Sequence, residues 1–235
     1  MKRGGVIWAA LPAKDLAQAK ERLAAVLNAQ ERRALAHAML EDVLGALSAS
    51  TRLAGIAVVT RDPAVIRVAE RFGVRVVAEG SSAGQTRAVQ LAARTLAGEG
   101  RAGMLTVPGD VPLVSAAELD RLLDAHGASP ALTITPSRDR RGTNALICSP
   151  PEVLSPAFGE DSFLPHVEAA RRGGIATRIA PSPGLGLDID GLHDLVAFLR
   201  APSTTRTRTW LEASGVAARV EARVLRTTPL ERVHR

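Results

Sequence analysis

The sequence of 235 residues contains no tyrosine, a single cysteine and no long hydrophobic run. The lone Cys148 excludes an internal disulfide and a zinc site built from cysteines. The longest apolar runs, such as residues 56–59, have the length of a β-strand, whereas a membrane helix needs about 20 apolar residues. Residues 1–3 are basic, but the apolar stretch behind them is short and ends at Pro12. We therefore expect a soluble, cytoplasmic protein with no membrane partner.

Aromatic residues make up only 3% of the chain, which affects how the net charge of +6 is interpreted. Proteins that bind nucleic acids often interleave aromatic and basic residues. Residues 201–235 hold seven arginines and three glutamates, so the tail carries +4 and the first 200 residues only +2. We therefore predict no nucleic-acid partner. The alternative is that the basic tail binds RNA.

Lysine is also scarce, because only Lys2, Lys14 and Lys20 occur among 30 basic residues. Two of these lysines flank one loop after the first apolar segment, and Arg22 follows closely. An ammonium group binds phosphate as a compact point charge, which the planar guanidinium of arginine does not copy. We predict that Lys14, Lys20 and Arg22 clamp a triphosphate; the alternative is a solvated basic loop.

Short apolar segments alternate with segments of helical spacing along most of the chain. Two helix starts are marked, by Asp62 before a proline and by Ser115 with a glutamate three residues on. Strands are expected at residues 6–11, 55–60, 74–78, 104–107, 131–135, 145–148 and 175–180. This alternation predicts an α/β fold with a mostly parallel sheet flanked by helices. We predict one domain over residues 1–200 and a basic tail over 201–235, which forms a short helix or is partly disordered.

Acidic residues follow two of the expected apolar segments, at positions where open parallel sheets bind ligands. Asp110 comes after residues 104–107, and Asp188 and Asp190 alternate with apolar residues, which places both carboxylates on one side of an extended segment. Mg²⁺ prefers one or two carboxylates together with phosphate oxygens, so these three residues are candidate metal ligands. The alternatives are that Asp110 only caps a turn and that Asp190 caps the helix expected at 191–200.

Two turns that contain Gly142 and Gly159 could hold a carboxylate or a phosphate, because glycine lets the backbone approach a ligand closely. Ser162 stands at an expected helix start, where free N–H groups favour anions. The alternative is a pair of ordinary turns. His166, one turn into that helix, is more often a structural histidine than an acid or base. Gly84 and Gln85 end a small-residue segment that either contacts a nucleotide base or serves as a plain connection.

Eight short motifs occur in one order between residues 6 and 199. They are Pro-x-Lys, Ala-Lys-x-Arg-Leu, Glu-Arg, Met-Leu-x-Asp-Val, Gly-Asp-x-Pro-Leu, Gly-Thr-Asn-Ala-Leu, Phe-Gly-x-x-Ser-Phe-x-x-His and Leu-Asp-Ile-Asp. Together they resemble the CofC guanylyltransferases of the biosynthesis of the deazaflavin coenzyme F-420. Each motif is weak alone, but eight in the right order are specific.

The resemblance implies a Rossmann-like nucleotidyltransferase fold of the glycosyltransferase-A type. It implies transfer of GMP from GTP to the phosphate of 2-phospholactate, phosphoenolpyruvate or 3-phosphoglycerate, with release of pyrophosphate. By position, Lys14, Lys20 and Arg22 match the triphosphate-binding segment. Asp110, Asp188 and Asp190 match Mg²⁺ ligands, and Thr143, Gly159 and Ser162 match positions that hold the phospho-acid.

The chain departs from the family pattern at Glu21, where the family often has Ser or Thr, and at residues 84–86, where it usually has a Gly-Leu-Asn-like sequence. The tail beyond residue 200 has no matched counterpart. Nucleotidyltransferases of the molybdopterin or sugar-phosphate type usually carry a glycine-rich loop after the first strand, and residues 11–23 contain no glycine. A non-catalytic GTP-binding regulator is the alternative from another class. The chain could form a homodimer.

Overall fold

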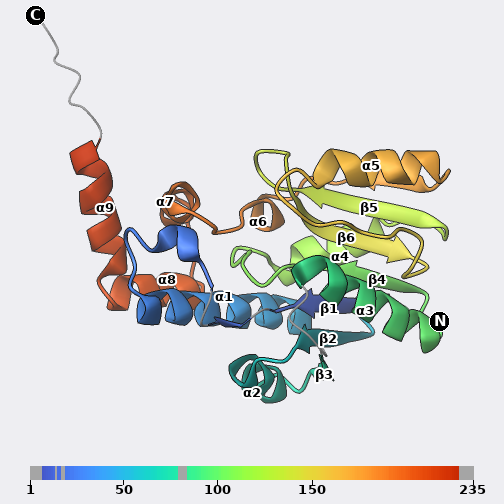
Figure 1. Ribbon diagram of the computed structural model, residues 1–235, viewed down its shortest axis with the longest axis horizontal. Helices are drawn as coiled ribbons and strands as arrows, with labels where there is room; N and C mark the ends of the chain where they lie inside the picture. Colours follow the sequence, from blue (N-terminus) through green and yellow to red (C-terminus); the bar gives the residue numbers. More distant parts are fainter. Residues whose placement is uncertain (1–6, 14, 17–18, 79–83, 228–235) are drawn as a thin grey trace, which may run out of the picture.

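The computed structural model describes residues 7–13, 15–16, 19–78 and 84–227. They form one seven-stranded sheet with helices on both faces (Figure 1), in the strand order β3-β2-β1-β4-β6-β5-β7. The strands are β1 (Ile7–Pro12), β2 (Gly55–Thr60), β3 (Arg75–Ala78), β4 (Gly103–Thr106), β5 (Ala131–Pro136), β6 (Thr143–Ser149) and β7 (Ala176–Ile179). The α/β fold with a mostly parallel sheet is confirmed, and β6 is the exception, antiparallel to both β4 and β5.

The register of β4 and β6 divides the core into two layers. Leu105 pairs with Ile147, and both lie in the larger core, under α1 (Ala29–Ala49), α2 (Pro63–Arg71) and α4 (Ala116–Asp124). Met104 pairs with Cys148 on the opposite face, where α3 (Gly84–Gly98) and α5 (Phe163–Arg172) cover the sheet. Because neighbouring positions of a strand point to opposite faces, the apolar strands β4 and β6 supply both layers at once.

The helix starts agree with the signals in the sequence. The Asp62 side chain accepts a hydrogen bond from the backbone of Ala64, and Pro63 occupies the first turn of α2. Ser115 and Glu118 form the expected reciprocal capping box of α4. Glu118 also accepts from Ser182 Oγ (2.7 Å) and the backbone N–H of Gly184 (2.8 Å), so it ties α4 to the short helix α6 (Pro183–Gly186).

The basic tail folds onto the domain through two helices, α8 (Arg206–Ala213) and α9 (Val216–Thr227), which follow α7 (Leu192–Arg200). Figure 1 shows α8 lying along α1, and Asp42 of α1 accepts from two backbone N–H groups at the start of α8. Leu211, Val216 and Val220 belong to the larger core. Where a short helix or a partly disordered tail was expected, residues 206–227 form two helices that pack on the domain. In the described part of the chain, no helix combines the length and the apolar character that a membrane crossing needs.

Candidate active site

The antiparallel direction of β6 brings the predicted site residues to one edge of the sheet. The carboxyl ends of β1 and β4 lie at the edge where β6 begins, with Thr143 and Asn144. Asp110 follows β4 in the chain, and its carbonyl accepts from the backbone N–H of Ile189 (3.0 Å). That bond holds Asp188 and Asp190 beside Asp110, although about 80 residues separate them in the sequence.

Two cavities open at this edge and meet at Asp110 and Asp190. The first, here called the hairpin cavity, has a volume of about 620 Å³ and is lined by the β5–β6 connection and the turn at residues 158–162. The second, here called the β1 cavity, has a volume of about 580 Å³ and is lined by the loop after β1, by α1 and by the start of α3. Cavities of this size hold small-molecule ligands.

The predicted site residues divide between the two cavities. Thr143, Gly159, Ser162 and Asp188 line the hairpin cavity. Lys20 and Gly84 line the β1 cavity. Four predicted residues line both, namely Arg22, Gln85, Asp110 and Asp190. Lys14 lies outside the described residues.

Lys20 lies at the centre of the acidic cluster. Its Nζ is 2.6 Å from Asp110 Oδ2 and 2.7 Å from Asp190 Oδ1, and its side chain is only 8% exposed. Lys20 adopts left-handed backbone angles (φ 57°), which are uncommon outside glycine and aim the side chain inward from the loop. Burial lowers the pKa of Lys20, but the two carboxylates outweigh it and raise the pKa above its ordinary value. The ammonium group therefore stays charged.

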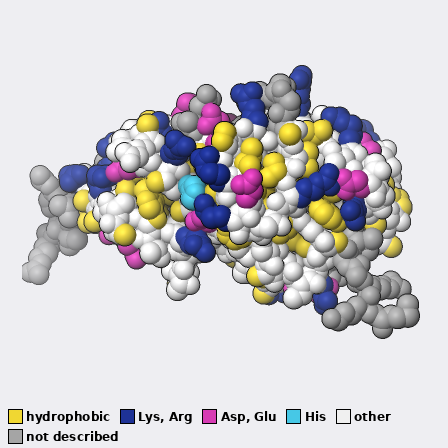
Figure 2. Space-filling view, turned by 90° about the horizontal axis from the view of Figure 1, so that it is seen from below, with side chains coloured by type: hydrophobic (Ala, Val, Ile, Leu, Met, Phe, Trp, Pro, Cys, Tyr) yellow, Lys and Arg dark blue, Asp and Glu magenta, His cyan; other side chains and the backbone are white. Residues whose placement is uncertain are grey.

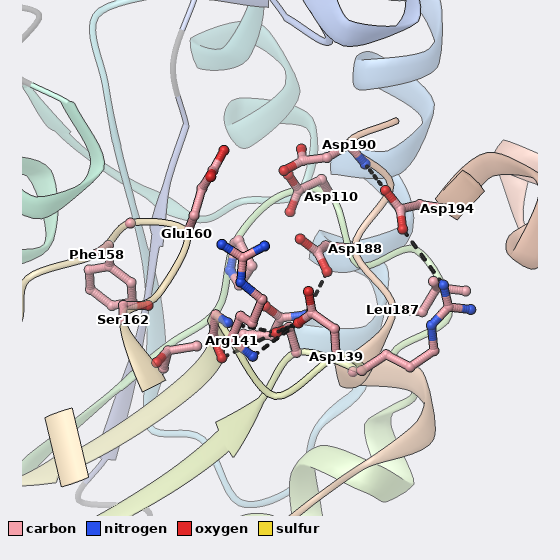
Figure 3. Close-up of a pocket in the computed structure, with 18 of the residues that line it drawn as sticks. Asp110, Asp139, Arg141, Phe158, Glu160, Ser162, Leu187, Asp188, Asp190 and Asp194 are labelled. Carbon is pink, nitrogen blue, oxygen red and sulfur yellow. Dashed lines mark hydrogen bonds and ion pairs between the residues drawn. The ribbon is translucent and has the colours of Figure 1, made fainter. Parts of the chain in front are cut away.

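Asp188 faces Asp110 and Asp190 across the cluster (Figure 3). Asn144 Nδ2 donates to Asp188 Oδ1 (3.0 Å) and to the carbonyl of Leu185 (2.8 Å), which fixes the carboxylate in place. Burial raises the pKa of Asp188 to about 6, and the negative charges of Asp110 and Asp190 add to the shift. A buried carboxyl group beside two others is a place where a second cation is favourable.

The cluster fits Mg²⁺ held jointly by protein and phosphate. Asp110 Oδ1 is buried and has no hydrogen-bond partner among the described residues, so it offers a free lone pair. No group of three acidic, histidine or cysteine side chains in the described ranges forms a cage for a metal. Mg²⁺ does not require one, because it binds one or two carboxylates and completes its shell with water and substrate phosphates. Asp110 and Asp188 are the residues best placed to hold it.

The prediction that Asp190 could cap the following helix is wrong. The N-cap of α7 is Gly191, and the carboxylate of Asp194 accepts from the backbone N–H groups of Gly191 (2.9 Å) and Asp190 (3.3 Å). Asp194 takes the capping role, since its side chain reaches back from the first turn. The carboxylate of Asp190 is thereby left to pair with Lys20.

Arg22 lines both cavities and pairs with Glu160. Both side chains are largely exposed, so the pair can open at little cost. A second pair, Arg141 with Asp161 (2.7 Å), joins the β5–β6 connection to the turn at residues 158–162. The walls of the hairpin cavity are thus held together by ion pairs between two irregular segments.

The sequence placed Asn144 and Glu160 in the two candidate turns without giving them a role, and it did not indicate Asp194. Asn144 stands in the Gly-Thr-Asn-Ala-Leu motif, and a buried amide at the start of an apolar strand was a usable signal. Asp194 stands three residues after Gly191, which is the spacing of a capping carboxylate. No sequence signal connects Glu160 to Arg22, because they lie 138 residues apart.

The fold is shared with solved transferases that use nucleotide substrates. A solved structure described as a nucleotide-diphospho-sugar transferase from Desulfovibrio desulfuricans superposes with a TM-score of 0.75 at 16% identity, covering 93% of this chain and 98% of its own. A 4-diphosphocytidyl-2C-methyl-D-erythritol synthase superposes with a TM-score of 0.58 at 17% identity, covering 84% and 97%. At such identities the likeness shows the shared fold.

Sequence similarity narrows the class to one family. The family described as guanylyl transferase CofC like matches residues 7–229, and the chain belongs to it. The match includes α8 and α9, so the expectation that the tail has no family counterpart is wrong for residues up to 229.

Three curated relatives differ in the acid that they are named for. A phosphoenolpyruvate guanylyltransferase from Conexibacter woesei is 38% identical over 81% of this chain and 86% of its own. A 2-phospho-L-lactate guanylyltransferase from Methanothermobacter thermautotrophicus is 32% identical, over 86% and 88%. A 3-phospho-D-glycerate guanylyltransferase from Colwellia psychrerythraea is also 32% identical, over 83% and 92%.

Proposed function

We propose that this chain transfers GMP from GTP to the phosphate of a small phospho-carboxylic acid and releases pyrophosphate, as a step of coenzyme F-420 biosynthesis. The observation that carries the proposal is the pair of cavities that meet at Asp110 and Asp190, since a transfer reaction needs two substrates in contact. The β1 cavity takes the nucleotide and the hairpin cavity takes the acid. Phosphoenolpyruvate is the first acid to test, because relatives named for it reach 36–38% identity.

The reaction forms a bond between a phosphate oxygen of the acid and the α-phosphorus of GTP, and breaks the bond to the leaving pyrophosphate. The phosphate of the acid is ionised at neutral pH, so no general base is required. The protein must align the two substrates and offset their negative charge. Bound Mg²⁺ would neutralise phosphate oxygens and act as a Lewis acid.

The side chains around the junction have separate tasks in this scheme. Lys20, already charged between Asp110 and Asp190, stabilises charge at the triphosphate when phosphate oxygens enter the cluster. Arg22 leaves the exposed Glu160 for the triphosphate, assisted by Lys14. Gly84 and Gln85 line the nucleotide side, while Thr143, Gly159 and Ser162 hold the acid.

The remaining partners follow from surface and composition. On the face shown in Figure 2, several basic side chains lie close together around a histidine, and the others are scattered among acidic and apolar side chains. In the tail, Arg219 pairs with Glu31 (2.7 Å) and Arg208 donates to carbonyl oxygens. Because these tail arginines already have partners in the protein, we expect no nucleic-acid partner, and we propose a cytoplasmic location. A homodimer stays a prediction.

The deciding experiment measures pyrophosphate release with GTP and Mg²⁺ and each of the three acids in parallel, with ATP as the control nucleotide. We expect release with GTP and phosphoenolpyruvate, and much slower release with ATP. Release with another of the three acids would keep the reaction and change the substrate. GTP binding without pyrophosphate release with any acid would contradict the proposal and favour a non-catalytic GTP-binding protein.

A further inference from the structure

His166 is a buried side chain next to the hairpin cavity that the reaction scheme above does not use. It lies in the first turn of α5 and is only 2% exposed. Its Nδ1 is 3.0 Å from Thr143 Oγ1, and its Nε2 is 2.9 Å from the backbone N of Ala157. His166 therefore connects the first residue of β6 to the segment that leads into Gly159.

The partner of Nε2 decides where the ring proton lies. A backbone N–H can only donate, so Nε2 accepts the bond from Ala157 and carries no proton. The neutral ring then has its proton on Nδ1, which donates to Thr143 Oγ1. Burial lowers the pKa of His166 to about 4, so the ring remains neutral in this tautomer at physiological pH.

This tautomer fixes the role of the Thr143 hydroxyl. Because Thr143 Oγ1 accepts a bond from His166, its own proton must point in another direction. Thr143 lines the hairpin cavity, on the same wall as Gly159 and Ser162. A hydroxyl oriented in this way can donate to an anion in the cavity without first rotating about its C–O bond.

The segment before Gly159 is held from two sides. The backbone N–H of Phe158 donates to Thr86 Oγ1 of α3 (2.9 Å), and the Phe158 ring packs edge-on against His166 with 5.3 Å between centroids. Figure 3 shows Phe158 and Ser162 together, across the cavity from the aspartates. Losing the His166 nitrogens would free both the Thr143 hydroxyl and this segment.

We propose that His166 is a positioning residue that aims the Thr143 hydroxyl at the carboxylate of the bound phospho-acid. The inference rests on the proposed function. The phosphate of the acid must reach the junction at Asp110 and Asp190, so its carboxylate lies at the far end, beside Thr143 and Ser162. His166 touches neither substrate and does not transfer a proton.

The test compares variants by KM and kcat for pyrophosphate release. His166→Phe keeps a ring of similar size and removes both nitrogens, while Thr143→Val removes the hydroxyl. Each should raise KM for phosphoenolpyruvate about tenfold, and KM for GTP should change less than about twofold. The double variant should be no worse than His166→Phe alone, because the Thr143 hydroxyl is no longer oriented once the imidazole is gone. His166→Asn places an amide near the Nδ1 position, so its KM for phosphoenolpyruvate should lie close to that of wild type.

A matched control exists elsewhere in the fold. His126 makes the same type of contact, with Nδ1 2.8 Å from Thr133 Oγ1 and Nε2 3.0 Å from Ser149 Oγ, and it lines neither cavity. His126→Phe should lower thermal stability without changing KM for the acid. If His166→Phe behaves like His126→Phe, or if the two single effects multiply in the double variant, the proposal is overturned.

A second measurement needs no turnover and separates this inference from the proposed function. A long-range ¹H–¹⁵N spectrum of the wild-type protein should show His166 protonated at Nδ1 and not at Nε2; the opposite tautomer overturns the proposal. Thermal-shift titration with phosphoenolpyruvate should stabilise wild type at lower concentrations than His166→Phe. If wild type binds the acid in this way and yet releases no pyrophosphate, the proposed reaction fails and the positioning role stands.

Discussion

The two cavities are built from different kinds of chain. The β1 cavity has ordered elements in its wall, including Met39 and Leu40 of α1, which give it an apolar side. The hairpin cavity is lined mainly by irregular segments rich in charged and polar groups, among them Arg138 and Arg141. An apolar wall suits a nucleobase, and a polar wall that carries arginines can bind a small anion. Under the proposed function, each cavity therefore recognises one substrate, and the reaction takes place where the cavities meet.

The largest effect is expected at the junction. Asp110→Ala removes a wall that both cavities share and deprives Lys20 of one partner. We expect kcat to fall by about 10³-fold with either substrate saturating, because charge stabilisation at the reacting phosphates is lost. The matched control is Asp124→Ala. Asp124 lies on α4, and its exposed carboxylate pairs with Arg52 (2.8 Å). Equal activities of the two variants would show that Asp110 is not part of the reaction centre.

Lys20→Met tests whether the junction needs a cation even without substrates. The variant leaves Asp110 and Asp190 facing each other without the ammonium that lies between them. In a metal-free buffer, the free energy of unfolding should fall by about 3 kcal/mol, as for a buried ion pair that loses one partner. Mg²⁺ should then stabilise the variant more than wild type, measured as a larger rise in Tm. A variant as stable as wild type with the metal chelated would contradict this account.

A matched pair of glycine substitutions should separate the cavities. An added Cβ at Gly109, in the β1 cavity, makes only ordinary contacts, and one at Gly159, in the hairpin cavity, meets nothing within 4 Å. Both variants should fold, since neither position has a positive φ. Gly109→Ala should raise KM for GTP, and Gly159→Ala KM for the acid, each about tenfold. If both variants affect both substrates alike, the cavities are not separate recognition sites.

Glu118→Gln should weaken the hydrogen bonds that join α4 to α6, the short helix that precedes Asp188 and Asp190. Burial acts to raise the pKa of Glu118, but hydrogen bonds from Ser182, Gly184 and Ser115 outweigh it and lower the pKa below its ordinary value. A lowered folded-state pKa contributes stability above the unfolded-state pKa, and that contribution is lost as pH falls through the folded-state value. The variant should be about 1–3 kcal/mol less stable at pH 7, and the difference should shrink in denaturant titrations as pH falls below the ordinary glutamate pKa of 4.5. A difference in stability that does not change with pH would show that the charge of the Glu118 carboxylate does not contribute.

The smallest effect is expected at the exposed bridge between the walls. Glu160→Gln should change the free energy of unfolding by less than about 1 kcal/mol, because both partners are largely exposed. Freed Arg22 should bind the triphosphate more readily, so KM for GTP should fall by about twofold at low ionic strength. A rise in KM for GTP would contradict the proposal that Arg22 binds the triphosphate.

The sequence predicted most of the elements, because their signals are local. Strand lengths, the Asp62 cap and the Ser115–Glu118 box depend on residues within a few positions of one another. The acidic residues after apolar segments likewise indicated one edge of the sheet. The direction of β6 was not predictable, because an apolar strand has the same pattern in either direction.

Long-range pairings in the site also escaped prediction. Lys20 was expected to face a triphosphate, and the structure places it between Asp110 and Asp190, which lie 90 and 170 residues away. The sequence indicated a short helix in the tail, but not which residues of the domain it packs against. Such contacts depend on how elements pack, which local periodicity does not encode.

The tight hairpin between β5 and β6 has a consequence for divergence within the family. Ser137 and Gly142 close it with backbone and side-chain hydrogen bonds (2.9 and 2.8 Å), and residues 137–142 form one wall of the hairpin cavity. Insertions and substitutions in such a connection leave the parallel strands undisturbed. If the hairpin cavity takes the acid, as proposed, changes at residues 137–142 can reshape it without altering any residue that lines the β1 cavity.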